Sequence, residues 1–115
     1  MLEKVIEKHL CENIRHAGGM AIKFTSPQRR SVPDRIVLRP GDEAATKAIQ
    51  KLIYISDRGA LDLAHEVLRC YIRFVECKST TGKLTDGQAR EIARFKKLGF
   101  TVDVVNSKEA VDNIL

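Results

Sequence analysis

Apolar side chains near the start of the chain recur at the spacing of an α-helix. Between positions 2 and 17 they return every three or four residues, as on one face of an amphipathic helix. They are Leu2, Val5, Ile6, Leu10 and Ile14. Gly18-Gly19 follows, and glycine is the residue that most often ends a helix. The pattern therefore predicts a helix over residues 2–17.

Four later segments alternate apolar and polar residues, or are rich in β-branched and aromatic ones, which is typical of strands. The predicted strands are 20–25, 34–39, 71–78 and 100–105. A loop at 26–33 separates the first two, and its two prolines and two adjacent arginines combine turn chemistry with the capacity to bind phosphate.

The segment between the last two strands predicts a helix over 86–98. Thr85 and Gln88 match the capping box that begins helices, and Gly99 would end the helix. Three apolar residues are expected to point inward from it, namely Ile92, Phe95 and Leu98. A crossover helix implies that the strands it joins are parallel, whereas the earlier strands are expected to be antiparallel. Ser107 would begin a short C-terminal helix. The order predicts an α/β fold with mixed strand pairing.

Residues 42–70 are predicted to form a mostly helical insertion between two strands that would otherwise make a hairpin. Helical patterns cover 42–52 and 60–70, and Gly59 interrupts them. Residues 53–55 would either extend the first helix or form a short strand. The apolar residues of the insertion need burial, on this domain or on a partner subunit.

Length and composition favour one folded domain over residues 1–115. No apolar run approaches the roughly 20 residues of a membrane span, so no membrane association is expected. No signal peptide is visible, and the three cysteines form no C-x-x-C pair, so we expect reduced thiols in a cytoplasmic protein.

Positive charge is concentrated in two segments, and the chain carries a net +5. Residues 22–39 hold five basic side chains and one acid, and residues 78–97 hold six and two. Such clusters could neutralise phosphates around a metal centre, although a solvated basic surface would give the same pattern.

The acids within these clusters point to metal chemistry. Asp34 opens one strand, and Glu76 and Lys78 lie on the same side of another because side chains alternate along a strand. If the two strands pair, Asp34 and Glu76 meet at one end of the sheet. Two carboxylates suit Mg²⁺, with the backbone carbonyl of Cys77 as a third ligand. Lys78 would orient or help deprotonate a water, or stabilise charge in the transition state.

Each of these residues also has a simpler interpretation. Glu76 and Lys78 could form a surface ion pair, and Gln88 could serve only the capping box or also face the site. Glu3 and Glu7 lie at one edge of the first helix's apolar stripe, where either could reach the site, but first-turn acids are also favoured by the helix dipole. The side chain of Cys77 should point to the opposite face of the sheet, into the core.

Several common sites are disfavoured by missing motifs. The chain contains no G-x-x-x-x-G-K, G-x-G-x-x-G, G-x-S-x-G or H-E-x-x-H. We therefore expect no small-molecule cofactor.

The assembled motifs resemble the virus-type replication-repair nuclease domain (VRR-Nuc) of the PD-(D/E)xK nuclease superfamily, in its stand-alone phage form. The resemblance spans nearly the whole chain apart from 42–70. It is carried by Gly18-Gly19, Lys23-Phe24, Ser26-Pro27, Arg30-Ser31-Val32-Pro33-Asp34-Arg35, Phe74-Val75-Glu76-Cys77-Lys78, Gln88 and Leu98-Gly99-Phe100. It implies a restriction-endonuclease-like fold, a central mixed sheet flanked by helices. It also implies a glutamate from the first helix in the site: Glu7 by its distance from the Gly-Gly turn, with Glu3 as the alternative.

The resemblance further implies a homodimeric, Mg²⁺- or Mn²⁺-dependent DNA endonuclease that resolves four-way (Holliday) junctions or similar branched DNA. A non-catalytic nucleic-acid-binding module, or a nuclease for flaps and nicked or linear duplex, is the alternative. The expected nucleic-acid contacts are Arg29, Arg30, Lys83, Gln88, Arg90 and Arg94. Two features depart from the family: Ser31 stands where glycine is usual, and 42–70 replaces a tight hairpin.

Overall fold

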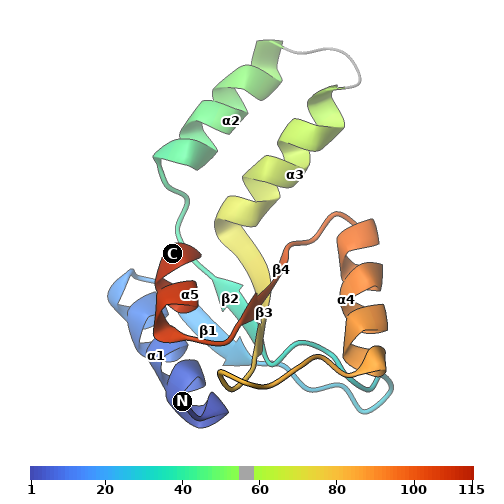
Figure 1. Cartoon of the computed structure of the whole chain (residues 1–115). Helices are drawn as coiled ribbons and strands as arrows, with labels where there is room; N and C mark the ends of the chain where they lie inside the picture. Colours follow the sequence, from blue (N-terminus) through green and yellow to red (C-terminus); the bar gives the residue numbers. More distant parts are fainter. Residues whose placement is uncertain (55–58) are drawn as a thin grey trace.

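The computed structural model describes residues 1–54 and 59–115, and it contains a mixed four-stranded sheet (Figure 1). The strands are β1 (Met20–Lys23), β2 (Arg35–Leu38), β3 (Ile72–Cys77) and β4 (Val102–Val105), in that order across the sheet. β1 and β2, and β2 and β3, pair antiparallel, whereas β3 and β4 pair parallel. The predicted mixed pairing is confirmed.

Helices cover both faces of the sheet. They are α1 (Glu3–His16), α2 (Glu43–Tyr54), α3 (Gly59–Tyr71), α4 (Asp86–Lys97) and α5 (Lys108–Asn113). Figure 1 shows α1 and α5 together on one side of the sheet and α4 on the other. This arrangement confirms the restriction-endonuclease-like α/β fold. Tyr71, expected to begin the third strand, instead ends α3, because the helical pattern of that segment continues up to the sheet.

The end of α1 follows from its two glycines. Gly18 has a φ of 85°, in the left-handed region that suits glycine. The N–H of Gly18 donates to the carbonyl of Arg15, and the N–H of Gly19 donates to that of Ile14. These two bonds form a Schellman motif, which satisfies the last carbonyls of the helix and turns the chain into β1.

The main core lies between α1, α5 and one face of the sheet. Its buried members are Ile6, Leu10, Ile14, Val37, Val75, Cys77, Val105 and Val111. Val75 and Cys77 alternate with Glu76 along β3, so the strand buries its apolar side chains here and sends the glutamate to the other face. The expectation that Cys77 faces the core is confirmed.

A smaller aromatic cluster lies under α4. Phe74 of β3 meets Phe95 of α4 edge to face, with ring centroids 4.8 Å apart. Ile92 joins this cluster, as predicted. Leu98 does not, and its prediction was wrong: it is 72% exposed. Leu98 follows the last helical residue and lies at the edge of the apolar stripe, so the chain turns at Gly99 (φ 96°) without burying it.

The segment between β2 and β3 forms two helices, α2 and α3, which pack against each other (Figure 1). α2 continues through Tyr54; Ile55, which was expected to share its structure, lies outside the described residues. Ala45 and Ala48 are buried, whereas Ile53 and Tyr54 are 73% and 88% exposed. The helices therefore bury only part of their apolar surface within the chain.

Across the described residues, none of the helices combines the length and apolar character needed to cross a lipid bilayer.

Two leucines test this account of the core. Leu10 is fully buried, so Leu10→Ala should lower the free energy of unfolding by about 2–5 kcal/mol, through lost apolar contact and a residual cavity. Leu98→Ala is the matched control and should change it by less than about 0.5 kcal/mol. Urea denaturation followed by circular dichroism measures both. A large loss for Leu98→Ala would contradict the exposed position of Leu98.

Candidate active site

The pairing of β2 with β3 brings Asp34 to Glu76. Arg35 pairs with Val75, so the next position outward places Asp34 opposite Glu76. The carbonyl of Asp34 accepts a 2.9 Å hydrogen bond from Phe24 N–H, which ties it to the end of β1 as well. Its side-chain Oδ2 accepts a 2.7 Å bond from Cys77 N–H. The predicted strand pairing is confirmed, and Asp34 is anchored on both neighbouring strands.

Glu76 and Lys78 point to the same side of β3, towards α4. Lys78 Nζ lies 3.6 Å from Glu76 Oε1. Lys78 N–H also donates to the carbonyl of Val105, which prolongs the parallel pairing past the end of β4. Glu76 is only 2% exposed, so the pair is not a surface ion pair. A buried carboxylate of this kind depends on specific partners.

Gln88 is one of those partners, and it has both of the roles considered for it. Thr85 Oγ1 accepts from Gln88 N–H at 3.1 Å, and Gln88 Oε1 accepts from Thr85 N–H at 2.9 Å, which completes the capping box of α4. The amide Nε2 of Gln88 donates to Glu76 Oε1 at 2.9 Å. The first turn of α4 is therefore bonded directly to the carboxylate of β3.

Both carboxyls hold their protons more tightly than free ones. Burial raises the pKa of Glu76 to about 7, with a further contribution from the nearby charge of Asp34 that Lys78 partly offsets. Burial also raises the pKa of Asp34, against the lowering effect of the Cys77 N–H. A buried carboxyl and a partly buried one close to it are arranged so that a cation would stabilise them.

The two glutamates of α1, Glu3 and Glu7, affect different carboxyls of the site. Beyond the effect of burial, the charge of Glu7 raises the pKa of Asp34, whereas the charge of Glu3 raises that of Glu76. The carboxylate of Glu7 is bonded to Arg35, with Oε1 2.8 Å from Nε. The structure thus brings Glu7 towards Asp34 but gives its carboxylate a cationic partner.

The available donors are oxygens. Among the described residues, no group of three or more His, Cys, Asp and Glu side chains is arranged to hold a metal ion. Asp34 and Glu76 supply two carboxylates, and the thiol of Cys77 is in the core. Mg²⁺ is commonly held by one or two carboxylates, with water and substrate phosphate completing its shell, so a site of this size fits it.

The basic residues expected to bind nucleic acid divide into two groups. Arg29 and Arg94 both bind Glu91, at 2.6 Å and 3.1 Å. Their side chains are still 52% and 60% exposed. Arg30, Lys83 and Arg90 are exposed as well. A hollow of about 420 Å³ beside the start of α4 is lined by Arg29, Arg30, Arg90 and Arg94.

Glu91 is the residue that sequence reasoning missed. It is 3% exposed although it is charged. Its position one residue before Ile92 and its spacing of three from Arg94 were available signals, because they place it near the buried stripe with a cation one turn away. Its long-range partner Arg29 could not be read from spacing.

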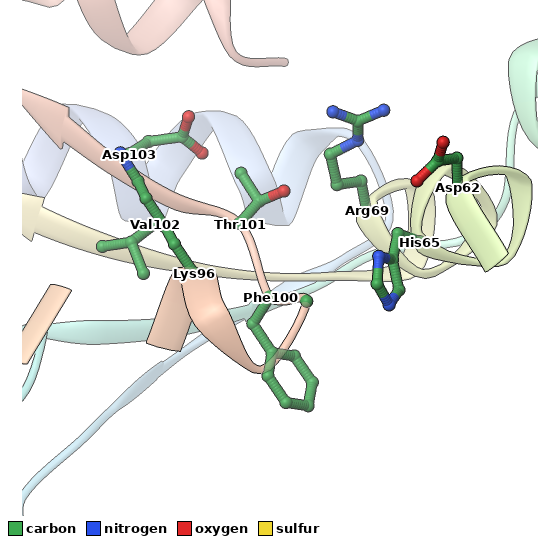
Figure 2. A pocket seen from close by; sticks show the side chains of 9 residues that line it. Asp62, His65, Arg69, Lys96, Phe100, Thr101, Val102 and Asp103 are labelled. Atoms are coloured by element: carbon green, nitrogen blue, oxygen red, sulfur yellow. The ribbon is translucent and has the colours of Figure 1, made fainter. Parts of the chain in front are cut away.

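A larger hollow of about 530 Å³ lies elsewhere, between α3 and the start of β4 (Figure 2). Figure 2 shows Asp62, His65 and Arg69 of α3 facing the segment from Phe100 to Asp103. Val102 pairs with Phe74, two residues before Glu76, and neither Asp34 nor Glu76 lines this hollow. The candidate site is therefore the carboxylate cluster and not this hollow.

Comparison with known proteins gives a consistent result. No family model matches the chain. It is 37% identical over 107 residues, 93% of its length, to the protein named "Putative nuclease p44" of Acyrthosiphon pisum secondary endosymbiont phage 1, of which it covers 85%. It superimposes on a solved structure described as a VRR_NUC domain with a TM-score of 0.68 and 27% identity, covering 97% of this chain and 91% of that one.

The sequence relative and the solved structure agree with the motifs that surround Asp34 and Glu76. The phage relative shares more than a third of its aligned residues with this chain, and the structural match includes all but a few of its residues. The chain belongs to the VRR-Nuc family of nucleases, in its phage type.

Proposed function

We propose that this chain is a Mg²⁺- or Mn²⁺-dependent endonuclease that hydrolyses phosphodiester bonds in branched DNA, with four-way junctions as its preferred substrate. The observation that carries the proposal is the meeting of Asp34, Glu76 and Lys78 at one end of the β2–β3 pair. Membership of a nuclease family supports the class of reaction.

The donor set supports a hard divalent cation. Asp34, Glu76 and the backbone carbonyl of Cys77 would hold the ion through oxygen atoms. When bound, Mg²⁺ would activate a water and neutralise charge on the phosphate. The Cys77 N–H would keep Asp34 Oδ2 oriented, and Gln88 would do the same for Glu76 Oε1.

Lys78 is the proposed catalytic cation. Its ammonium lies beside Glu76 and is largely buried, so its position is restricted. From there it would orient the attacking water, help to remove its proton, or stabilise the negative charge that develops on the phosphate oxygens.

Selectivity for branched DNA would come from phosphate contacts and shape. Arg30 and Arg90 line the hollow beside the start of α4, and Lys83 lies in the loop between β3 and α4. These exposed side chains would bind phosphates without reading bases. A homodimer would present two sites related by a twofold axis, as a symmetric junction requires. Exposed apolar side chains on α2, including Ile53 and Tyr54, support self-association through that helix.

Cleavage of a labelled four-way junction, beside linear duplex and single strand, tests the function. We expect paired symmetric nicks in the junction with Mg²⁺ and none with EDTA. Lys78→Ala should reduce the single-turnover rate at least about 100-fold, the usual effect of removing a group that acts on a proton in the transition state. Lys8→Ala, which removes an exposed lysine of α1, is the matched control and should cleave normally.

Other outcomes of the same assay identify the alternatives. Nicks only in flaps or linear duplex would support nuclease activity but contradict the proposed preference for four-way junctions. Folded protein that shifts the junction on a gel, yet cuts no substrate with Mg²⁺ or Mn²⁺, would leave a nucleic-acid-binding module.

The helix-borne acid can be assigned by a pair of variants. Because the charge of Glu7 acts on Asp34 and its carboxylate is bonded to the neighbouring Arg35, Glu7→Gln should lower the cleavage rate about 10- to 100-fold, the range for groups that support a metal site. The glutamine oxygen can still accept from Arg35, which protects the fold. Glu3→Gln should have a smaller effect, and a larger one would assign the role to Glu3. Single-turnover rates over a range of Mg²⁺ concentrations measure both.

Protonation of Glu76 links the site to stability. Its folded pKa of about 7 lies above its ordinary value of 4.5, so the folded state binds more protons than the unfolded state between these values. Without metal, this group should cost stability as pH rises from about 4.5 through 7, by about 3 kcal/mol in total at 1.36 kcal/mol per pKa unit.

Thermal unfolding in EDTA between pH 4.5 and 8.5 tests this linkage. Glu76→Gln should remove that part of the pH dependence and be more stable than the wild type at pH 8. Mg²⁺ should raise the melting temperature of the wild type more at pH 8 than at pH 5.5, since it binds the ionised carboxylate. Equal pH profiles for the two proteins would contradict the raised pKa.

A further inference from the structure

The loop at 26–33 delivers Asp34 to the site, yet it has few bonds of its own. Arg29 N–H donates to Ser26 Oγ within the loop, at 3.2 Å. Among the described residues, the hydrogen bonds that tie this loop to another element are the two from the guanidinium of Arg29 to Glu91. Pro33, directly before Asp34, is fully buried, so the loop is held by apolar packing at its end and by the side-chain bonds of Arg29 in its middle.

The contact between Arg29 and Glu91 has the bidentate geometry of a guanidinium–carboxylate pair. Arg29 Nε donates to Oε1 at 2.6 Å and Nη2 donates to Oε2 at 3.1 Å, which is the two-pronged pairing that a guanidinium can make and an ammonium cannot. Arg94 Nη1 adds a third bond, to Oε2 at 3.1 Å. The hydrogen bond from Arg29 is the main reason why the pKa of Glu91 is lowered, against the effect of burial.

A second contact holds the loop against the same helix. Ser31 has a φ of 63°, a left-handed conformation that costs energy for a residue other than glycine and persists when its surroundings hold it. A side-chain carbon added to Gly87 would come within 2.9 Å of Ser31 Oγ, so the loop lies directly on the first turn of α4. The strained residue sits between the Arg29 anchor and Asp34.

α4 therefore supports both carboxylates. Gln88 bonds Glu76 directly, and Glu91, one turn further along, holds the loop that leads to Asp34. The two contacts would keep the acids at a fixed separation, which a cation bound between them requires.

We propose that Arg29 is a positioning residue for the metal site, held by the buried Glu91, and that phosphate binding on this face belongs to Arg30 and Arg90. The role assigned to the metal site rests on the proposed nuclease function. It gives Arg29 and Arg94 a role other than the expected phosphate contact. A buried carboxylate engages both guanidinium groups, although their side chains stay 52% and 60% exposed.

Four variants separate positioning from phosphate contact: Arg29→Ala, Arg29→Lys, Glu91→Gln and the control Arg30→Ala. Three quantities are measured for each. They are the affinity of the protein alone for Mn²⁺ by calorimetry, the dependence of junction binding on salt in EDTA, and the single-turnover cleavage rate with saturating protein. Circular dichroism and thermal unfolding confirm that each variant is folded.

We expect Arg29→Ala to weaken Mn²⁺ binding and slow cleavage about 10- to 100-fold, as loss of a supporting partner does at metal sites, with an unchanged salt slope. Arg29→Lys should remain impaired in Mn²⁺ binding and cleavage, because lysine keeps the charge but cannot make the bidentate pair with Glu91. Glu91→Gln should bind DNA as tightly as the wild type or more so, since it removes a negative charge, and yet cleave slowly. Arg30→Ala should reduce the salt slope by about one and leave Mn²⁺ affinity unchanged.

The opposite pattern overturns the proposal. If Arg29→Ala lowers the salt slope by about one with normal Mn²⁺ affinity, and Arg29→Lys restores binding and cleavage, then Arg29 contacts phosphate. Should Arg29→Ala fail to fold, Arg29→Lys and Glu91→Gln carry the comparison. Failure of the wild type to cleave any DNA would overturn the nuclease function, whereas the Mn²⁺ affinities would still decide whether Arg29 positions the carboxylates.

Discussion

The hydrogen bond from Cys77 N–H to Asp34 Oδ2 is the interaction on which the site depends. It joins the last residue of β3 to the residue just before β2, at the point where the ladder between the strands has run out. The bond uses a backbone donor, so its position is set by the register of the sheet and not by a flexible side chain. The register is in turn set by the core, because a slip of one residue would send Val75 and Cys77 out of the α1–α5 layer and put Glu76 into it. The apolar face of β3 thus fixes where its acidic face presents Glu76.

This arrangement buries the carboxylates of Glu76 and Glu91, which costs free energy of folding. Hydrogen bonds that involve residues of α4 reduce that cost. A buried acid without partners would be strongly destabilising. Glu76 receives a hydrogen bond from Gln88, and Glu91 receives three from two arginines. The pKa values of the two carboxyls shift in opposite directions. Glu91 is surrounded by cations, and its pKa is lowered mainly by the Arg29 bond, whereas burial keeps the pKa of Glu76 raised in the company of Asp34. Glu91 is already paired with arginines of the protein, whereas Glu76 would still be stabilised by an added cation.

Much of this fold could be predicted from sequence because its signals are local. The Gly18-Gly19 end of α1 and the Thr85–Gln88 capping box involve residues a few positions apart, and both occur as expected. The approach of Asp34 to Glu76 followed from strand alternation and pairing, which need only two strand assignments.

Prediction failed where the tertiary position of a residue overrides the local sequence pattern. Leu98 has helical spacing but lies beyond the last turn, and Tyr71 has strand propensity but ends a helix. The Arg29–Glu91 pair joins residues 62 positions apart, and no spacing rule reaches it.

The insertion of α2 and α3 is compatible with the site because of where it enters the sheet. β2 and β3 are paired from Leu38 with Ile72 at one end to Arg35 with Val75 at the other. The insertion connects at the Leu38–Ile72 end, and the acids lie beyond the Arg35–Val75 end. At about 3.4 Å per residue, the length of the ladder keeps the insertion on the order of 10 Å or more from the carboxylates. The two-helix connection between the strands therefore lies away from Asp34 and Glu76. What the insertion changes is the surface of the molecule, since it adds exposed apolar side chains far along α2. The carboxylates and the exposed apolar surface of α2 thus lie at opposite ends of the same pair of strands.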